Sequence, residues 1–112
     1  MSQSCPFCRI VSGELKADIV YEDETCLAFR DIAPQAPSHV LIIPKDHVPS
    51  ASHVEDHVLW VSLMVAVREV VRRISPDSGY RLVVNCGEDA GQTVPHLHVH
   101  LLSGRPLGWP PG

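Results

Sequence analysis

His96-Leu97-His98-Val99-His100-Leu101-Leu102 is the stretch of the sequence that decides the fold. Histidines alternate with apolar residues along most of it, and successive side chains of a strand point to opposite faces of a sheet. The pattern therefore predicts a strand with one apolar face toward a core. Its three imidazoles form a row on the other face, spaced roughly 6–7 Å apart.

Histidine suits proton transfer and metal binding near neutral pH. Three interpretations of the row remain open: unrelated surface histidines, a histidine-rich metal site, or a set of imidazoles that act as nucleophile, acid and orienter. The chain has seven histidines, and the other four are His39, His47, His53 and His57.

The segments upstream of this strand predict an α+β domain. A capping box formed by Ser52 and Glu55, followed by apolar residues at helical spacing, predicts a long helix from Val54 to about Ile74. This helix is apolar on most sides, so one side would cover the sheet and another would meet a partner subunit. The order of elements favours an antiparallel five-stranded meander. The predicted strands span residues 19–21, 26–29, 39–43, 80–85 and 96–102, and a short N-terminal helix spans residues 5–12.

The length of 112 residues suits a single domain over residues 1–112. The chain has 9 Lys and Arg against 13 Asp and Glu, a net charge of −4 that disfavours non-specific binding to nucleic acid. No apolar run approaches the roughly 18 residues of a membrane span, and the N-terminus lacks the pattern of a signal peptide. We expect a cytoplasmic protein without nucleic-acid or membrane partners, whose four cysteines form no disulfide framework.

The loop Gly87-Glu88-Asp89-Ala90-Gly91-Gln92-Thr93 precedes the histidine strand and suits an anion. Glycines let backbone N–H groups approach a ligand closely, and the Thr93 hydroxyl adds a donor. Imidazoles beside such a loop favour phosphate chemistry, which needs a nucleophile and donors around the phosphoryl oxygens.

The histidine strand resembles the His-φ-His-φ-His-φ-φ signature, where φ is apolar, of the histidine triad (HIT) family. Residues 31–39, 43–47, 79–85 and 109–112 resemble the Hint branch of that family, so the resemblance covers essentially the whole chain. It implies a HIT-like fold in which two chains pair into a ten-stranded sheet. The C-terminal tail, residues 103–112, would lie near the partner subunit's site.

The resemblance also implies a function. Hint-like proteins are homodimers that hydrolyse purine nucleoside 5′-phosphoramidates, and they cleave the P–N bond through a nucleotidyl-histidine intermediate. Two alternatives stay open. One is a dinucleoside polyphosphate hydrolase, which the tail Trp109-Pro110-Pro111-Gly112 disfavours, and the other is a non-catalytic protein that binds nucleotide or zinc.

By the same resemblance, His98 is the nucleophile, His100 binds the α-phosphate, and Thr93 lies near the phosphate and the leaving group. His39 supports the triad from behind. The other residues implied in nucleotide binding are Asp31 at the ribose hydroxyls, Ile32 at the purine, Asn85 at the ribose or phosphate, and Gly91 and Gln92 in the phosphate-binding turn.

A second set of residues begins with Cys5-Pro6-Phe7-Cys8. A Cys-x-x-Cys pair with two further histidines fits a tetrahedral structural zinc site. The resemblance supplies His47 and His96 as those histidines, which would make His96 a zinc ligand rather than the nucleophile. A redox pair and two plain reduced thiols are the alternatives. Of the remaining cysteines and histidines, we expect Cys26 and Cys86 to be buried within strands and His53 and His57 to be solvated.

Overall fold

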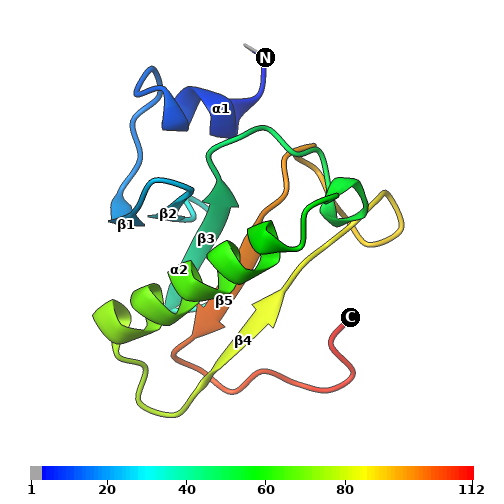
Figure 1. The fold of residues 1–112 in the computed structure, drawn as a ribbon. Helices are drawn as coiled ribbons and strands as arrows, with labels where there is room; N and C mark the ends of the chain where they lie inside the picture. Colours follow the sequence, from blue (N-terminus) through cyan, green and yellow to red (C-terminus); the bar gives the residue numbers. More distant parts are fainter. Residues whose placement is uncertain (1–3) are drawn as a thin grey trace.

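Five strands form the sheet at the centre of the fold, as the sequence predicts: β1 (Ile19–Glu22), β2 (Cys26–Arg30), β3 (Ser38–Pro44), β4 (Tyr80–Val83) and β5 (Val99–Ser103). The structure is a computed structural model that describes residues 4–112. The strand order is β1-β2-β3-β5-β4, with every neighbouring pair antiparallel (Figure 1).

The position of β5 departs from the sequential order of a simple meander. Between β3 and β4 the chain passes through helix α2 (Val58–Ile74), which returns it so that β4 runs in the same direction as β3. With β5 between these two strands, each neighbouring pair remains antiparallel. The α+β class, the five-stranded sheet and the pair of one long and one short helix are confirmed.

Helix α2 covers one face of the sheet and builds the larger core. In Figure 1 it crosses in front of β3 and β5. Among residues 4–112, no helix is both long enough and apolar enough to cross a membrane. The buried residues of α2 pack against alternate residues of three central strands. The helix contributes Leu63, Ala66, Val67 and Val70, and the strands contribute Cys26, Ala28, Val40, Ile42, Val99 and Leu101.

The opposite face of the sheet carries the short helix α1 (Pro6–Val11) and a smaller core. Phe7 and Ile10 of α1 belong to this core, together with the other alternating set of strand residues. The Cys5 thiol caps α1 by accepting a hydrogen bond from the Cys8 N–H at 3.4 Å. Because the apolar residues of β5 face α2, His100 of this strand and His98 just before it face the side of α1. That second strand set comprises Leu27, Phe29, Leu41 and Ile43.

The predicted start of the long helix is wrong. Helix α2 begins at Val58, and the capping box of Ser52 and Glu55 does not form. Instead, Ser50 caps a separate 3-10 turn, η1 (Ala51–His53), by accepting a hydrogen bond from the Ser52 N–H at 3.2 Å.

Extended backbone at Val54 separates this turn from α2. Val54 packs against the larger core from a loop. The sequence pattern placed it in the helix because it is apolar, but it is apolar because it contacts the core. The N-cap residue of α2 is His57, whose side chain makes no capping hydrogen bond, and the Asp56 carboxylate before it accepts the N–H of Val58, the first helical residue, at 2.9 Å.

Strand β5 begins at Val99, after the first two histidines of the row. Leu97 N–H donates to the carbonyl of Val48 at 2.6 Å instead of to a neighbouring strand. The partner strand β4 ends at Val83, opposite His100. The alternation of faces nevertheless extends back to Leu97, which is buried in the larger core.

The two cysteines outside the Cys-x-x-Cys pair differ. Cys26 is fully buried as predicted, and burial raises its pKa to about 12. Cys86 lies in the loop after β4 and is only half-buried, so its predicted place inside a strand is wrong. Its thiol lies 3.2 Å from the Ser52 hydroxyl. His53 and His57 are exposed, as predicted.

Candidate active site

A cavity of about 410 Å³ opens on the α1 face of the sheet and brings most of the predicted nucleotide-site residues together. His98 and His100 line it from β5 and the segment just before it. Thr93 comes from the preceding loop. Asp31 and Ile32, which directly follow β2, also line it.

The cavity has an apolar lining that the sequence analysis did not assign to the site. Phe7 and Ile10 come from α1, and Phe29 and Leu41 come from β2 and β3. Ile32 is 99% exposed, so it lies at the rim and is not a core residue. A flat apolar ring would be sandwiched well by such a lining. In the sequence, the position of α1 beside this cavity was indicated by the predicted zinc site, which joins Cys5 and Cys8 to His96 of the histidine strand.

The ring of His98 has a defined tautomer. Its Nδ1 lies 2.7 Å from the carbonyl oxygen of His96. A carbonyl only accepts, so Nδ1 of the neutral ring carries the hydrogen and Nε2 keeps a free lone pair. Phe7 packs edge-on against the ring, with the centroids 5.2 Å apart. The arrangement leaves Nε2 as the nucleophilic nitrogen.

A second chain of hydrogen bonds sets the tautomer of His100. The Gln35 N–H donates to His39 Nδ1 at 3.0 Å, so the hydrogen of neutral His39 lies on Nε2. His39 Nε2 lies 2.9 Å from His100 Nδ1 and donates to it. His100 therefore carries its own hydrogen on Nε2, and it is a hydrogen-bond donor at the cavity.

Burial keeps both of these rings neutral. Burial lowers the pKa of His39, and the nearby Asp31 carboxylate opposes that effect only in part. For His100, burial together with the neighbouring His98 and His39 lowers the pKa to about 4. Neutral rings at pH 7 are the state that the hydrogen-bond chain requires.

Asp31 is held at the cavity by its own turn. One carboxylate oxygen accepts the Ala33 N–H at 2.8 Å, and the other lies 3.5 Å from His39 Nε2. The Asp31 N–H donates to the backbone carbonyl of His39 at 2.9 Å. The carboxylate is partly exposed and still has acceptor capacity for hydroxyl donors.

Three predicted binding residues lie outside the cavity lining: Asn85, Gly91 and Gln92. The Gln92 side chain braces the loop before the histidines. Its amide nitrogen donates to the carbonyls of Pro49 and Val94 at 2.8 and 3.0 Å, and its amide oxygen accepts the Gly87 N–H at 3.0 Å. These bonds fix the loop from which Thr93 reaches the cavity.

A second group of side chains lies beside the cavity: Cys5, Cys8, His47 and His96 have one ligand atom each within 4.8 Å of one another. The Cys5 thiol lies 3.3 Å from His96 Nδ1, and the Cys8 thiol lies 3.2 Å from His47 Nδ1. In a tetrahedral zinc site, bound sulfur and nitrogen ligands are about 3.5 Å apart. His96 Nε2 donates to the Pro44 carbonyl at 2.9 Å, which leaves the lone pair on Nδ1, facing the thiols. The donor set fits zinc.

Asp31, His39 and His100 form another cluster with metal-ligand atoms. Here the tautomers disfavour a cation. His39 Nδ1 accepts the Gln35 N–H, so a hydrogen occupies the Nε2 atom that would have to bind the metal. This cluster is suited to holding protons, whereas the cysteine cluster is suited to holding a metal.

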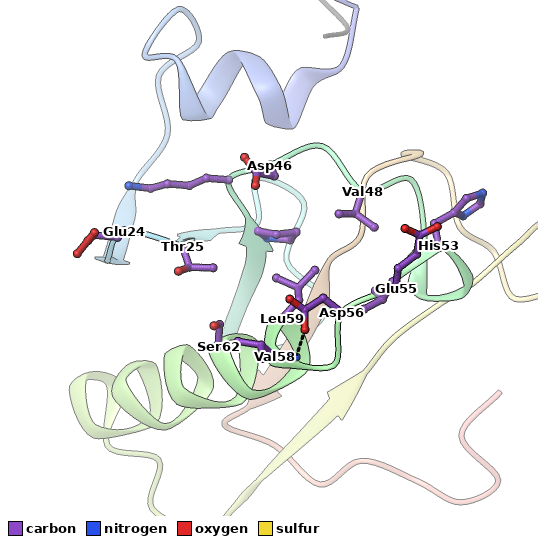
Figure 2. A pocket seen from close by; sticks show the side chains of 13 residues that line it. Glu24, Thr25, Asp46, Val48, His53, Glu55, Asp56, Val58, Leu59 and Ser62 are labelled. Atoms are coloured by element: carbon purple, nitrogen blue, oxygen red, sulfur yellow. Dashed lines mark hydrogen bonds between the residues drawn. The ribbon is translucent and has the colours of Figure 1, made fainter.

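A different hollow, of about 460 Å³, lies near the N-terminus of α2 (Figure 2). Its rim carries the carboxylates of Glu24, Asp46, Glu55 and Asp56. His53 lines this hollow, with its Nδ1 2.7 Å from the Ser50 hydroxyl, but none of the histidines of the row does. The candidate active site is therefore the cavity on the α1 face, which His98 and His100 line.

Comparison with known proteins agrees with this geometry. The family model described as the HIT domain matches residues 12–107. The chain belongs to the HIT family. It is 49% identical to an uncharacterised HIT-like protein of Synechocystis over the full length of both chains.

Solved structures of the HIT family share the fold. A HIT family hydrolase from Legionella pneumophila is 45% identical, with a TM-score of 0.92 over 97% of this chain and 100% of that one. A histidine triad nucleotide-binding protein from Candida albicans is 32% identical, with a TM-score of 0.83 over 96% of this chain and 83% of that one. The fold is therefore that of HIT family hydrolases.

Proposed function

We propose that this HIT protein hydrolyses the P–N bond of purine nucleoside 5′-phosphoramidates through a nucleotidyl-histidine intermediate on His98. The observation that carries the proposal is the hydrogen bond from His98 Nδ1 to the His96 carbonyl, which leaves the Nε2 lone pair free beside a cavity lined by His98, His100, Thr93 and Asp31. The family of the chain and the name of its Candida relative support a nucleotide substrate.

In the first step, the lone pair of His98 Nε2 attacks the α-phosphorus. The P–N bond to the amine breaks, and the amine leaves with the bonding electrons and takes up a proton from the surrounding water, which the water proton released in the second step replaces. The His100 Nε2–H donates to a non-bridging phosphoryl oxygen, where negative charge gathers in the transition state. The Thr93 hydroxyl provides a second donor on the side of the leaving group.

In the second step, a water oxygen attacks the same phosphorus. The bond from phosphorus to His98 Nε2 breaks, the electrons return to the ring, and the water loses a proton to the surrounding medium. The nucleoside monophosphate is released. Two steps with a good imidazole leaving group replace one difficult displacement.

The lining of the cavity supports the choice of a nucleoside. We propose that the Asp31 carboxylate accepts hydrogen bonds from the ribose hydroxyls, because a carboxylate offers two oxygens to paired donors. The base would lie between Ile32 at the rim and the apolar residues of α1 and β2. Asn85, Gly91 and Gln92 would act from outside the cavity lining, through the loop that carries Thr93.

We propose that zinc binds at the cysteine cluster and has a structural role. Cys5, Cys8, His47 and His96 would hold it, and it would link α1 to the start of the histidine row. When bound, the ion supplies a rigid tetrahedral joint and no reaction chemistry. The His96 ring then fixes the carbonyl that orients His98.

We also propose a homodimer. Helix α2 exposes Val61 and Met64, whose side chains are 59% and 50% exposed, on the side away from the sheet. The strand β4 is an edge of the sheet and would pair with its copy to give ten strands. Trp109 in the tail is 83% exposed and would approach the partner subunit's site.

The decisive experiment compares His98→Asn with the unmodified protein on adenosine 5′-phosphoramidate. We expect turnover to fall by at least about a thousandfold, since the nucleophile is removed, while AMP binding remains. His57→Asn, an exposed histidine far from the cavity lining, is the matched control. Quenching during turnover with an alkaline denaturant, which preserves the P–N bond, should leave AMP on His98 in the unmodified protein, detectable by mass spectrometry at alkaline pH.

Full activity of His98→Asn would refute the mechanism. Faster turnover of diadenosine polyphosphates than of any phosphoramidate would instead favour a dinucleoside polyphosphate hydrolase. Tight AMP binding with no turnover of either class would make the protein a non-catalytic nucleotide binder.

A further inference from the structure

The segment after β5 lies against the loop between β2 and β3. The Arg105 guanidinium donates twice to the backbone carbonyl of Gln35, from Nε at 3.2 Å and from Nη2 at 2.9 Å. Its Nη1 donates to the carbonyl of Pro106 at 3.0 Å. All three nitrogens of the guanidinium are thus bonded to backbone oxygens, and the side chain is held in one orientation.

Gly104 brings the same segment close to the loop at a second point. A Cβ atom added at Gly104 would lie 2.8 Å from Cβ of Pro37, which is closer than real Cβ contacts. The φ angle of Gly104 is +101°, a conformation that favours glycine. Pro37 and Gln35 are therefore both held by residues that directly follow β5.

The two backbone groups of Gln35 link this contact to the site. The carbonyl accepts from Arg105, and the N–H donates to His39 Nδ1 at 3.0 Å. That donor is what leaves the His39 hydrogen on Nε2, and His39 in turn leaves the His100 hydrogen on Nε2. A shift of Gln35 would break its hydrogen bond to His39 Nδ1, and neither His39 nor His100 would then be fixed in one tautomer.

We propose that Arg105 is a positioning residue for His100: by holding the Gln35 carbonyl, it keeps the Gln35 N–H on His39 and the His100 hydrogen on Nε2 at the cavity. The donation of the His100 hydrogen to a phosphoryl oxygen rests on the proposed function, whereas the assignment of the His39 and His100 tautomers does not depend on it. The cations that line the cavity are Lys16 and Arg30, and Arg105 is not among its lining residues. Arg105 acts through the loop and not through direct contact with a phosphate.

Asp31 is anchored separately from Arg105. Its N–H is bonded to the His39 carbonyl, and its carboxylate is bonded to the Ala33 N–H, so the residue at the ribose end keeps its own bonds when Arg105 is replaced. Loss of Arg105 is therefore expected to affect the chemical step more than substrate binding.

The test compares Arg105→Met and Arg105→Lys, with Arg72→Met as the control. Arg105 is exposed, so its replacement removes hydrogen bonds and little packing. Arg72 is an exposed arginine of α2 whose guanidinium bonds to the Glu69 carboxylate and not to the Gln35 carbonyl. Nitrogen-15 shifts of the imidazoles in the protein without ligand report the tautomers of His39 and His100, and kinetics on adenosine 5′-phosphoramidate report kcat and KM.

In Arg105→Met we expect both rings to change from a single tautomer to a mixture, with kcat lower by about tenfold and KM changed less than about threefold. Arg105→Lys restores part of kcat, because an ammonium group still donates to the Gln35 carbonyl. Gly104→Ala, which pushes on Pro37 with Arg105 intact, should alter the tautomers in the same direction. Arg72→Met should match the unmodified protein.

Unchanged tautomers in folded Arg105→Met would overturn the proposal, whatever happens to activity. Equal falls in kcat for Arg105→Met and Arg72→Met would overturn it as well. Altered tautomers in a protein that turns over no phosphoramidate would support the positioning role and reject the proposed function, so the two failures are distinguishable.

Discussion

At the scale of single residues, backbone atoms decide which nitrogen of each histidine carries a hydrogen. Carbonyls accept from His96 Nε2 and from His98 Nδ1, and a backbone N–H donates to His39 Nδ1. Each neutral ring therefore has one defined arrangement: His96 presents a lone pair to the thiols, His98 presents a lone pair to the cavity, and His39 donates a hydrogen bond to His100. Neutral rings fixed in this way need no neighbouring charge to set their roles.

The central residue of the hydrogen-bond chain is His39. We predict that His39→Phe lowers kcat by roughly tenfold to a hundredfold, because His100 loses the donor that fixes its tautomer. The Gln35 N–H also loses its acceptor, which should cost about 1–3 kcal/mol of stability. Steady-state kinetics and urea unfolding measure the two effects, with His57→Phe as the exposed control. Unreduced kcat in His39→Phe would show that His100 needs no such partner.

The same two rings predict how stability depends on pH. A histidine in the unfolded chain has a pKa of about 6.5, whereas burial lowers the folded pKa of His39 and brings that of His100 to about 4. The unfolded state therefore binds more protons as the pH falls below about 6.5, and the folded state loses stability down to about pH 4.

Urea unfolding between pH 7.5 and pH 4 would test this, with His100→Asn as the comparison. We expect the variant to lose less stability over that interval than the unmodified protein does. All other groups are the same in both proteins, so the difference between the two curves reports the replacement of His100. Parallel curves would contradict the assignment of His100 as a buried neutral ring.

At the scale of elements, the cavity exists because the short helix α1 lies over the strands that carry the histidines. A helix of this length has little stability of its own. It is held by the packing of Phe7 and Ile10, by the Cys5 cap, and, on our proposal, by zinc. One wall of the proposed nucleotide site thus depends on a helix with little stability of its own.

We predict that the purified protein contains about one zinc per chain and that Cys8→Ser loses it. The melting temperature should then fall by roughly 10 °C, as expected for loss of a few kcal/mol in a domain of this size. KM should rise more than kcat falls, because α1 supplies the apolar lining. Cys86→Ser, which alters a half-buried thiol outside the cluster, should keep both zinc and the melting temperature.

Metal content measured by mass spectrometry and calorimetry on both variants would check this. A metal-free protein with the same melting temperature as Cys8→Ser would leave the two thiols without a structural role. A disulfide between Cys5 and Cys8 in the purified, unreduced protein would favour the redox alternative.

The elements also show what sequence pattern predicts well. Alternation between His96 and Leu102 identified which residues face α2, and that assignment is confirmed even where the regular strand has not begun. The start of α2 could not be read in this way, because Val54 is apolar for contact with the core and not for helical periodicity. Apolar spacing reports burial, and burial does not distinguish a loop from a helix.

The site residues follow the same rule. Asp31, Thr93, His98 and His100 could be assigned from their motifs, and the cavity brings them together. The contribution of Arg105 could not be assigned, because it acts through the backbone of Gln35 and leaves no pattern in side-chain type. Contacts made by backbone groups become visible only when the chain is folded.

At the scale of the whole molecule, α2 and β4 present apolar surface that a single chain does not cover. Val58, Val61, Met64 and Val65 are all exposed large hydrophobic residues on α2, and Tyr80 and Val84 are exposed on or beside β4. Several exposed large apolar residues on one helix are typical of an interface between subunits.

We predict that Val61→Asp converts the dimer to a monomer at micromolar concentration, because a charge would be buried without a partner. Light scattering or sedimentation measures the change. Ile19→Asp, at an exposed apolar residue of β1 on the opposite edge of the sheet, should remain dimeric. If the unmodified protein is already monomeric at this concentration, the apolar face has another function and the ten-stranded sheet does not form.

The alternation of side chains along β5 also restricts insertions and deletions in this part of the chain. Val99 and Leu101 face α2 while His98 and His100 face the cavity, so one inserted or deleted residue would exchange the two sets. The imidazoles of His98 and His100 would enter the larger core, and the side chains of Val99 and Leu101 would line the cavity. Natural length variation should therefore be confined to the loops, such as residues 87–91, and be purged from residues 96–103.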